Sequence, residues 1–463
     1  MRPAAYSVML ALGLAACSGS AGLDAPDAGR TVTYEPGVPN FDMESIVRLE
    51  EDDSAVVDVY LSIPMLSLIF LKRDDRFVAT YEGAIRLVSR DVGGAVVEEA
   101  LAESLAVSTY DSTLSHHAHR TRTTLRPPPG EYVVEASITD LESGSTVQRR
   151  QAISIQPSTS TELFLGRPLL EARTDEGNFE PVVRLHMPAR SDSLRASVHL
   201  FNLDSTTPAE VVMRLLSFRS DTTVASPPFW ISPTRASLQY RGVDYGTTDT
   251  VQVSRRRLEP VDRTAMVQFE LPRLSPGIYR LELEARSGQD EVQRRHRVLS
   301  VKNASFPSMS ALDDLIDALT YIAFDDEIEY ILDARDPMER KRRFDAFWGS
   351  LVTNRNLAAN LIRLYYERIE EANLFFTAYK EGWKTDRGMI YTILGPPIYI
   401  DKRVDVEIWH YSYGDRDPAN TFVFERAIRH GNDPFENYIL QRRPYYQYEW
   451  SRAVDRWREG EVL

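Results

Sequence analysis

The sequence predicts a multidomain protein in which two all-β sandwiches precede an α+β domain of helices on a small antiparallel sheet. Three observations support this prediction. Short alternating apolar runs separated by turn residues fill residues 41–156 and again 161–301, as expected for antiparallel strands. Within 306–441 the apolar residues recur first at helical spacing and then in short strand-like runs. The length of 463 residues suits two to four domains of ordinary size.

Residues 1–16 have the composition of a secretory signal peptide. Arg2 provides a positive charge, and the apolar stretch that ends at Ala16 has the length of an h-region and is too short to span a bilayer. Leu14-Ala15-Ala16-Cys17 resembles the lipobox of bacterial lipoproteins. The resemblance implies cleavage before Cys17 and a lipid anchor on that residue, which would hold the chain at a membrane. The alternative is a secreted protein in which Cys17 is incidental.

Residues 17–40 are predicted to form a flexible tether, because they are small, polar and without a periodic pattern. Ser18 after the cysteine resembles the signal for the outer membrane, and the isolated Asp24 and Asp27 favour the periplasmic face. We therefore expect a lipoprotein of the cell envelope, on the outer membrane and facing the periplasm.

Composition limits the partners of the chain. Cys17 is its one cysteine, so the mature chain cannot form an internal disulfide and its cores must depend on apolar burial. The net charge of −14 becomes −15 once Arg2 is removed, which opposes binding to nucleic acid. Besides the membrane at Cys17, we expect a protein partner in the envelope, with a glycan as the alternative.

A duplicated hairpin connects the two β regions. PGEYVVEASITDLESGSTVQRRQAISI, from Pro129, aligns with PGIYRLELEARSGQDEVQRRHRVLSV, from Pro276. Each Pro-Gly pair predicts a turn before a strand, with Tyr132 and Tyr279 at the same strand position. Two such sandwiches resemble the immunoglobulin-like modules of bacterial surface proteins, a resemblance that implies architecture and no function.

Three helices are predicted in the third region. The first follows a capping box at Ser310–Asp313, the second begins at Asp336-Pro337, and the third carries an apolar stripe from Leu357 to Tyr379. Four strands are predicted after them, in MIYTIL, VEIWHYS, TFVFER and NYILQR.

The motif GWKTDRG, with the Gly-Pro-Pro that follows, joins the longest helix to the first of these strands. We expect Gly382 to end the helix, Gly388 to precede the strand and Trp383 to fill the space between helix and sheet. Side chains are expected to satisfy the backbone of the turn, Arg387 through a carboxylate. The motif residues are Gly382, Trp383, Thr385, Asp386, Arg387, Gly388, Gly395, Pro396 and Pro397.

The motif resembles the signature of the GWxTD domain family of bacterial lipoproteins and secreted proteins. ERKRRFDAFW, YYERIEEAN, IYTILGPP, EIWHYS and FVFER also resemble the pattern of this family, so the resemblance covers most of Ser310 to Leu440. It implies a class of domain but no reaction.

An enzymatic alternative combines Asp386, Arg387 and His410 into the acid–base set of an envelope-polymer hydrolase. The sequence contains no motif for a nucleophile, a catalytic zinc, a P-loop or a dinucleotide. His117 and His119 can share a strand face as metal ligands, but a third ligand is not evident. We therefore predict no catalytic residue, no cofactor and no metal site.

The tail, residues 442–463, places aromatic side chains among arginines. Rings at helical spacing can cover the domain of the chain itself, bind a partner or touch a membrane. The candidate partner surface is Tyr445, Tyr446, Trp450, Arg456 and Trp457. The resulting hypothesis is a non-enzymatic envelope scaffold, with a hydrolase and a glycan-binding module as alternatives.

Overall fold

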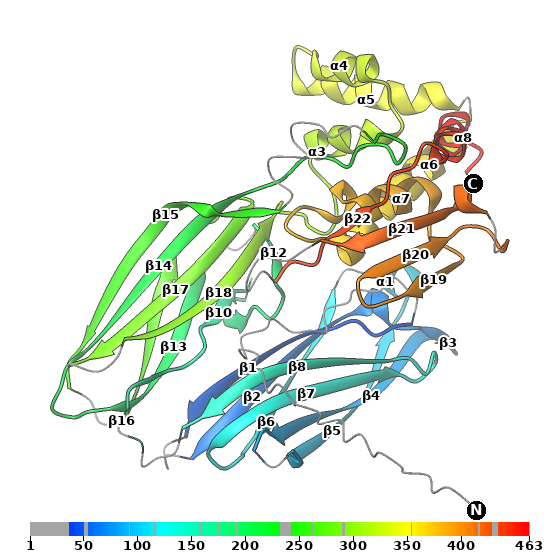
Figure 1. Ribbon diagram of the computed structural model, residues 1–463. Coiled ribbons are helices and arrows are strands. Elements are labelled where there is room, and N and C mark those ends of the chain that lie inside the picture. The colour runs from blue at the N-terminus through cyan, green and yellow to red at the C-terminus, as the bar shows by residue number, and fades with distance from the viewer. Residues whose placement is uncertain are drawn as a thin grey trace, which may run out of the picture.

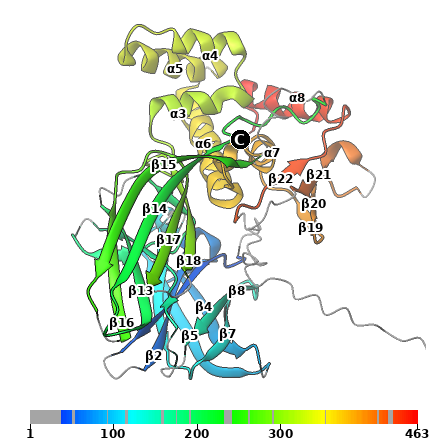
Figure 2. The same cartoon turned by 60° about the vertical axis from the view of Figure 1, so that its left-hand side comes forward.

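The computed structural model describes residues 37–462 except for some short segments. These are 51–53, 92, 114–116, 157–159, 161, 175, 190–192, 232–241, 261–262, 289–291, 353, 415–416 and 428–433. The predicted signal peptide, Cys17 and most of the predicted tether lie outside the described residues. Two β-rich bodies and a third body that carries the long helices are seen in Figures 1 and 2.

The first β module consists of two sheets that share one hydrophobic core. Along β7, Tyr132, Val134, Ala136 and Ile138 are buried at every second position, as a strand with one face on a core requires. One sheet has the order β1-β2-β6, with β1 Asp42–Leu49, β2 Ala55–Pro64 and β6 Ala118–Leu125. The other has the order β3-β4-β7-β8, and β5 also pairs with β4; these are β3 Leu71–Arg73, β4 Arg76–Ser89, β5 Ala95–Val107, β7 Gly130–Asp140 and β8 Thr146–Ile155.

The second β module repeats this arrangement of two sheets around one core. One sheet has the order β11-β10-β13-β16, with β9 also paired to β13; these are β9 Phe164–Leu165, β10 Leu169–Arg173, β11 Phe179–Pro181, β13 Leu194–Leu203 and β16 Arg263–Leu271. The other has the order β12-β18-β17-β14-β15, with β12 His186–Pro188, β14 Ala209–Ser220, β15 Val243–Leu258, β17 Gly277–Ser287 and β18 Gln293–Lys302.

The duplicated hairpin is present in both modules. Its strands pair antiparallel as β7–β8 and as β17–β18. The Tyr132 hydroxyl donates to the carbonyl of Pro128 at 2.9 Å, and the Tyr279 hydroxyl donates to the carbonyl of Ser275 at 2.8 Å. The two tyrosines therefore occupy equivalent positions, as their spacing predicts.

The C-terminal domain packs helices on a four-stranded antiparallel sheet (Figure 1). Among the described residues, no helix is long and apolar enough to cross a membrane. The helices are α3 Leu312–Asp317, α4 Asp325–Leu332, α5 Pro337–Leu351, α6 Arg355–Phe376, α7 Asp386–Leu394 and α8 Tyr446–Glu459. The sheet has the order β19-β20-β21-β22, with β19 Tyr399–Lys402, β20 Val406–His410, β21 Thr421–Arg426 and β22 Tyr438–Leu440.

The prediction of a strand in MIYTIL is wrong, because these residues form most of helix α7. Every residue from Arg387 to Ile393 is buried, and a helix buried on all sides has no amphipathic period to distinguish it from a buried strand. Gly388 thus lies within the helix, and Gly395, with φ +80°, ends it.

Predictions of helix ends had mixed outcomes. Asp336 caps α5 as predicted, accepting from the Glu339 amide at 2.8 Å. The capping box at Ser310 is wrong, since α3 begins after Ala311 without a side-chain cap. Gly382 does not end α6, which stops at Phe376, and α4 was not predicted.

The second β module is joined to the C-terminal domain by residues 221–231, which leave β14 and lie along the helices (Figures 1 and 2). The Ala225 amide donates to the carbonyl of Lys384 at 3.1 Å, and the Arg443 amide donates to that of Pro228 at 3.1 Å. Val224, Ala225 and Phe229 pack against the helical core. This bridging segment therefore completes the C-terminal domain with residues from the preceding module.

Candidate functional site

The turn of the GWxTD motif is closed by its own polar groups. The Thr385 hydroxyl donates to the carbonyl of Gly382 at 2.7 Å and accepts from the amide of Gly388 at 3.1 Å. The Gly382 amide donates to the Thr377 hydroxyl at 2.9 Å. Thr385 is thereby the N-cap of α7, and it satisfies an amide that the first turn of a helix would otherwise leave unpaired.

The two glycines of the motif are required by space. A Cβ atom on Gly382 would lie 1.8 Å from the carbonyl oxygen of Ala372, and one on Gly388 would lie 1.9 Å from that of Gly382. The backbones of α6, the turn and α7 therefore touch directly at these positions.

Trp383 fills the core beneath this turn. The residue is 2% exposed, and its ring meets the ring of Tyr321 edge-on at 6.1 Å. The Tyr321 hydroxyl donates to the carbonyl of Trp383 at 2.7 Å. Trp383 thus lies in the hydrophobic core that the helices and the sheet share, where it was predicted to pack.

The carboxylate of Asp386 ties α7 to the last strand. Arg442 reaches it with two nitrogens, at 2.6 and 3.1 Å, and the amide of Leu440 donates to it at 2.8 Å. Arg442 also donates to the carbonyl of Ser226 in the bridging segment at 3.0 Å. One carboxylate thus connects a helix, a strand and the second module through charge-assisted hydrogen bonds.

Arg387 forms a second, fully buried pair. Its guanidinium lies 3.4 Å from the carboxylate of Glu407, over the ring of Tyr438 at 4.3 Å. Glu407 also accepts from the indole of Trp409 at 3.2 Å. The predicted carboxylate partner of Arg387 is therefore on β20. The sequence could have indicated this partner. Glu407 lies two residues before Trp409 on the same strand, so both side chains point to the core, and a buried acid needs a buried cation.

The hydrolase set is not assembled in this structure. Side chains alternate along β20, so Glu407 and Trp409 face the helices, whereas His410 faces the other way. His410 stacks on Tyr399 of β19 at 4.2 Å. Asp386 therefore contacts the end of the last strand, whereas His410 contacts β19 on the other face of the sheet.

Other candidate residues have structural surroundings. Tyr446, Trp450 and Trp457 are buried in the C-terminal domain, which leaves Tyr445 and Arg456 as the exposed members of the predicted partner surface. Trp457 donates from its indole to the carbonyl of Ile393 at 2.9 Å. A partner surface made of the three buried rings is wrong, because these rings cover the domain of the chain itself. Among the described residues, no group of three His, Cys, Asp or Glu side chains could hold a metal ion.

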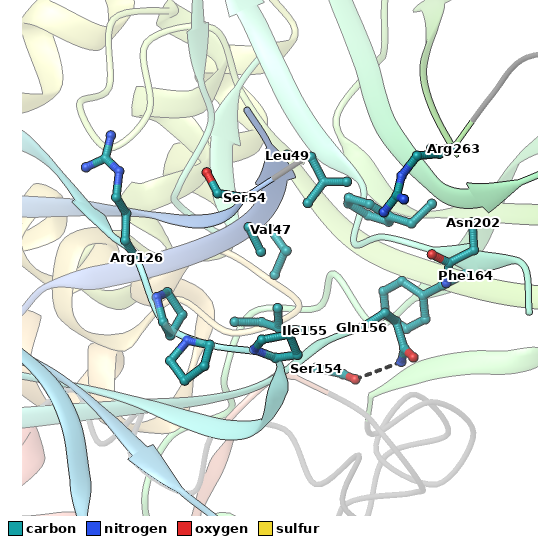
Figure 3. A pocket seen from close by; sticks show the side chains of 15 residues that line it. Val47, Leu49, Ser54, Arg126, Ser154, Ile155, Gln156, Phe164, Asn202 and Arg263 are labelled. Atoms are coloured by element: carbon teal, nitrogen blue, oxygen red, sulfur yellow. Dashed lines mark hydrogen bonds between the residues drawn. The ribbon is translucent and has the colours of Figure 1, made fainter. Parts of the chain in front are cut away.

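A cavity of about 330 Å³ lies where the first two β modules meet (Figure 3). Val47, Leu49, Ile155, Phe164 and Phe201 provide apolar walls. Further lining comes from residues 127–129, a run of three prolines, and from Ser54, Ala55, Arg126, Ser154, Gln156, Asn202 and Arg263. None of these lining residues is Asp, Glu, His or Cys, so the cavity suits binding and lacks the usual acid–base groups.

Backbone strain is concentrated at one side of the cavity. Asn202 has φ 60° and Arg263 has φ 66°, in the left-handed region that residues other than glycine rarely adopt. They lie where the β13–β16 pairing shifts by a β-bulge. Such strain is typical of positions that present side chains to a ligand.

The fold and the motif define a class: β-rich modules followed by an α+β domain held together by a buried Gly-Trp-x-Thr-Asp turn. Residues 286–459 match the family model described as the GWxTD domain. The chain therefore carries a GWxTD domain, as its sequence predicts.

Other comparisons add little. No curated protein matches the chain. Among solved structures, it is similar to red sea bream transglutaminase at 11% identity, over 58% of this chain and 32% of the enzyme, with a TM-score of 0.19. The chain thus spans about a third of that enzyme's length, and a score this low supports no conclusion.

Proposed function

We propose that the chain is a non-enzymatic lipoprotein of the bacterial envelope that acts as a protein-interaction scaffold. The main support for this proposal is that the charged and hydroxyl side chains of the motif bind other groups of the same domain. Asp386 binds Arg442 and Leu440, Arg387 faces Glu407, and Thr385 caps α7. Internal partners of this kind favour a role of the motif in organising the domain.

The proposed binding site is the cavity between the β modules, which would receive an apolar side chain of a protein partner. Its apolar walls and the lining residues Arg126 and Arg263 match the composition of small recognition pockets, in which a few polar groups accompany an apolar surface. The immunoglobulin-like character of both modules is part of the same proposal, and the two equivalent tyrosine–carbonyl hydrogen bonds support it.

The experiment compares the full-length lipoprotein with Leu49→Asp, in a cavity wall, and Leu141→Asp, at a position that is 50% exposed. Each is cross-linked in intact membranes and purified. A partner recovered with the wild type and with Leu141→Asp, but lost with Leu49→Asp, would support the proposal. Equal recovery with all three would reject the cavity as the binding site.

Lipidation and the absence of catalysis need their own tests. Cys17→Ala is expected to abolish labelling by a fatty-acid analogue and to release the mature domains from the membrane fraction. Hydrolysis of an envelope polymer that disappears in a folded Asp386→Asn variant would reject the non-enzymatic role.

A further inference from the structure

A second cavity, of about 100 Å³, lies where all three bodies of the chain meet. The first module contributes the start of β1 with the preceding Asn40, the end of β2 and an arginine of β8, and the second contributes the residues around the start of β12. The C-terminal domain contributes residues 306–307, the end of α6 and residues 434–436. A ligand held here would contact every module at once.

Arg184 brings an unmatched donor to this cavity. Its Nη2 atom is buried and has no hydrogen-bond partner among the residues that the structure describes. A guanidinium stays protonated in proteins, and a buried donor on a cation without an acceptor destabilises the structure that contains it. Burial lowers the pKa of Arg184, although nearby Asp42 acts in the opposite direction.

Several neighbouring polar groups of the cavity have protein partners. Arg149 donates to the carbonyl of Phe41 at 3.1 Å and to the side chain of Asn40 at 2.7 Å. Asn373 donates to the carbonyl of Pro307 at 2.9 Å. Glu436 lies 3.1 Å from Arg426.

The unpaired donor of Arg184, and not the net charge of the lining, indicates a ligand with an acceptor. Arg184 and Arg149 contribute two positive charges, and Asp42 and Glu436 contribute two negative ones. Glu436 pairs with Arg426, and Asp42 is the carboxylate that acts on Arg184. A cavity of this volume has room for a carboxylate or a phosphate group beside the Arg184 side chain. Stacked rings of His186 and Phe435, 6.0 Å apart, form one side.

We propose that this junction cavity binds a small anionic group, a carboxylate or a phosphate, through Arg184. The bound group would supply the acceptor that Nη2 lacks and would link the three bodies through one ion. This proposal does not depend on the proposed scaffold function, because it concerns a different cavity and a different chemistry.

The test measures thermal unfolding of the full chain in detergent, at constant ionic strength, while chloride is replaced by acetate or inorganic phosphate. An N-acetylated dipeptide with a free carboxylate, compared with its amide, distinguishes the end of a polypeptide from a free anion. The midpoint of the wild-type chain should rise saturably with at least one probe, since a ligand that binds only the folded state stabilises it.

Arg184→Met is the deciding variant, and Arg403→Met is its control, because Arg403 directly follows β19 and its side chain is 65% exposed. Arg184→Met should weaken anion binding by about tenfold or more and should unfold at or above the wild-type midpoint without a probe, because it removes a buried donor that has no acceptor. Arg403→Met should respond like the wild type. No wild-type response, an equal response in Arg184→Met, or failure of Arg184→Met to fold would overturn the proposal.

Discussion

Replacing Gly388 by alanine should destabilise the chain more than a helical glycine-to-alanine change ordinarily does. The new Cβ would lie 1.9 Å from the carbonyl oxygen of Gly382, 2.7 Å from its carbonyl carbon and 2.8 Å from the Cα of Trp383. All three are backbone atoms in a turn held by the Thr385 hydroxyl, so the clash cannot be relieved by rotating a side chain. Overpacking together with loss of the cap predicts a cost of about 3 kcal/mol or more.

Gly349→Ala is the matched control, because Gly349 also lies in a helix, α5, and a Cβ there would have no atom within 4 Å. That variant should be stabilised by about 0.5 to 1 kcal/mol through helix propensity alone. Urea unfolding of both variants, followed by far-ultraviolet circular dichroism and tryptophan fluorescence, measures the difference. A Gly388→Ala variant within 1 kcal/mol of the wild type, a margin of about one ordinary substitution, would refute the reasoning.

Three further predictions concern buried charges. Asp386→Asn should lower the free energy of unfolding by about 2 to 4 kcal/mol, since it leaves Arg442 without its charged acceptor; an unchanged urea midpoint would show that the pair is dispensable. Arg387→Met and Glu407→Leu should each lower the free energy of unfolding by about 3 kcal/mol. The double variant should lose clearly less than the sum of the two single losses, and additive losses in a double-mutant cycle would contradict the pairing. Burial lowers the pKa of Lys302 to about 8, whereas the unfolded side chain keeps its proton up to about pH 10.4. The unfolded chain then binds more protons between these values, so the stability of the wild type should rise from about pH 8 to 10 by an amount missing in Lys302→Met; parallel curves for the two proteins would exclude this contribution.

The sequence was informative where local pattern and packing agree. Alternation along β7 and the spacing of apolar residues in α6 predicted a β-rich N-terminal part and a helical C-terminal one, and Trp383 was expected in the core where it lies. The motif identified the GWxTD domain, which the family match confirms.

The remaining features depend on contacts between distant residues. Helix α7 is enclosed on all sides, so its sequence has the apolar run of a buried strand. Arg442 pairs with Asp386 across 56 positions of sequence, and no local pattern indicates such a partner. Both cavities lie where separate modules meet. They could not be predicted from the sequence pattern of any single module.

The bridging segment has a practical consequence for work on this domain. The family match begins at residue 286, before the last strand of the second module, and omits residues 221–231, which cover part of the helical core. A recombinant fragment cut at the boundaries of the match would expose the part of the helical core against which Val224, Ala225 and Phe229 normally pack. The segment that matches the family is thus shorter than the segment that packs as one body with the helices, so expression trials should start no later than β9.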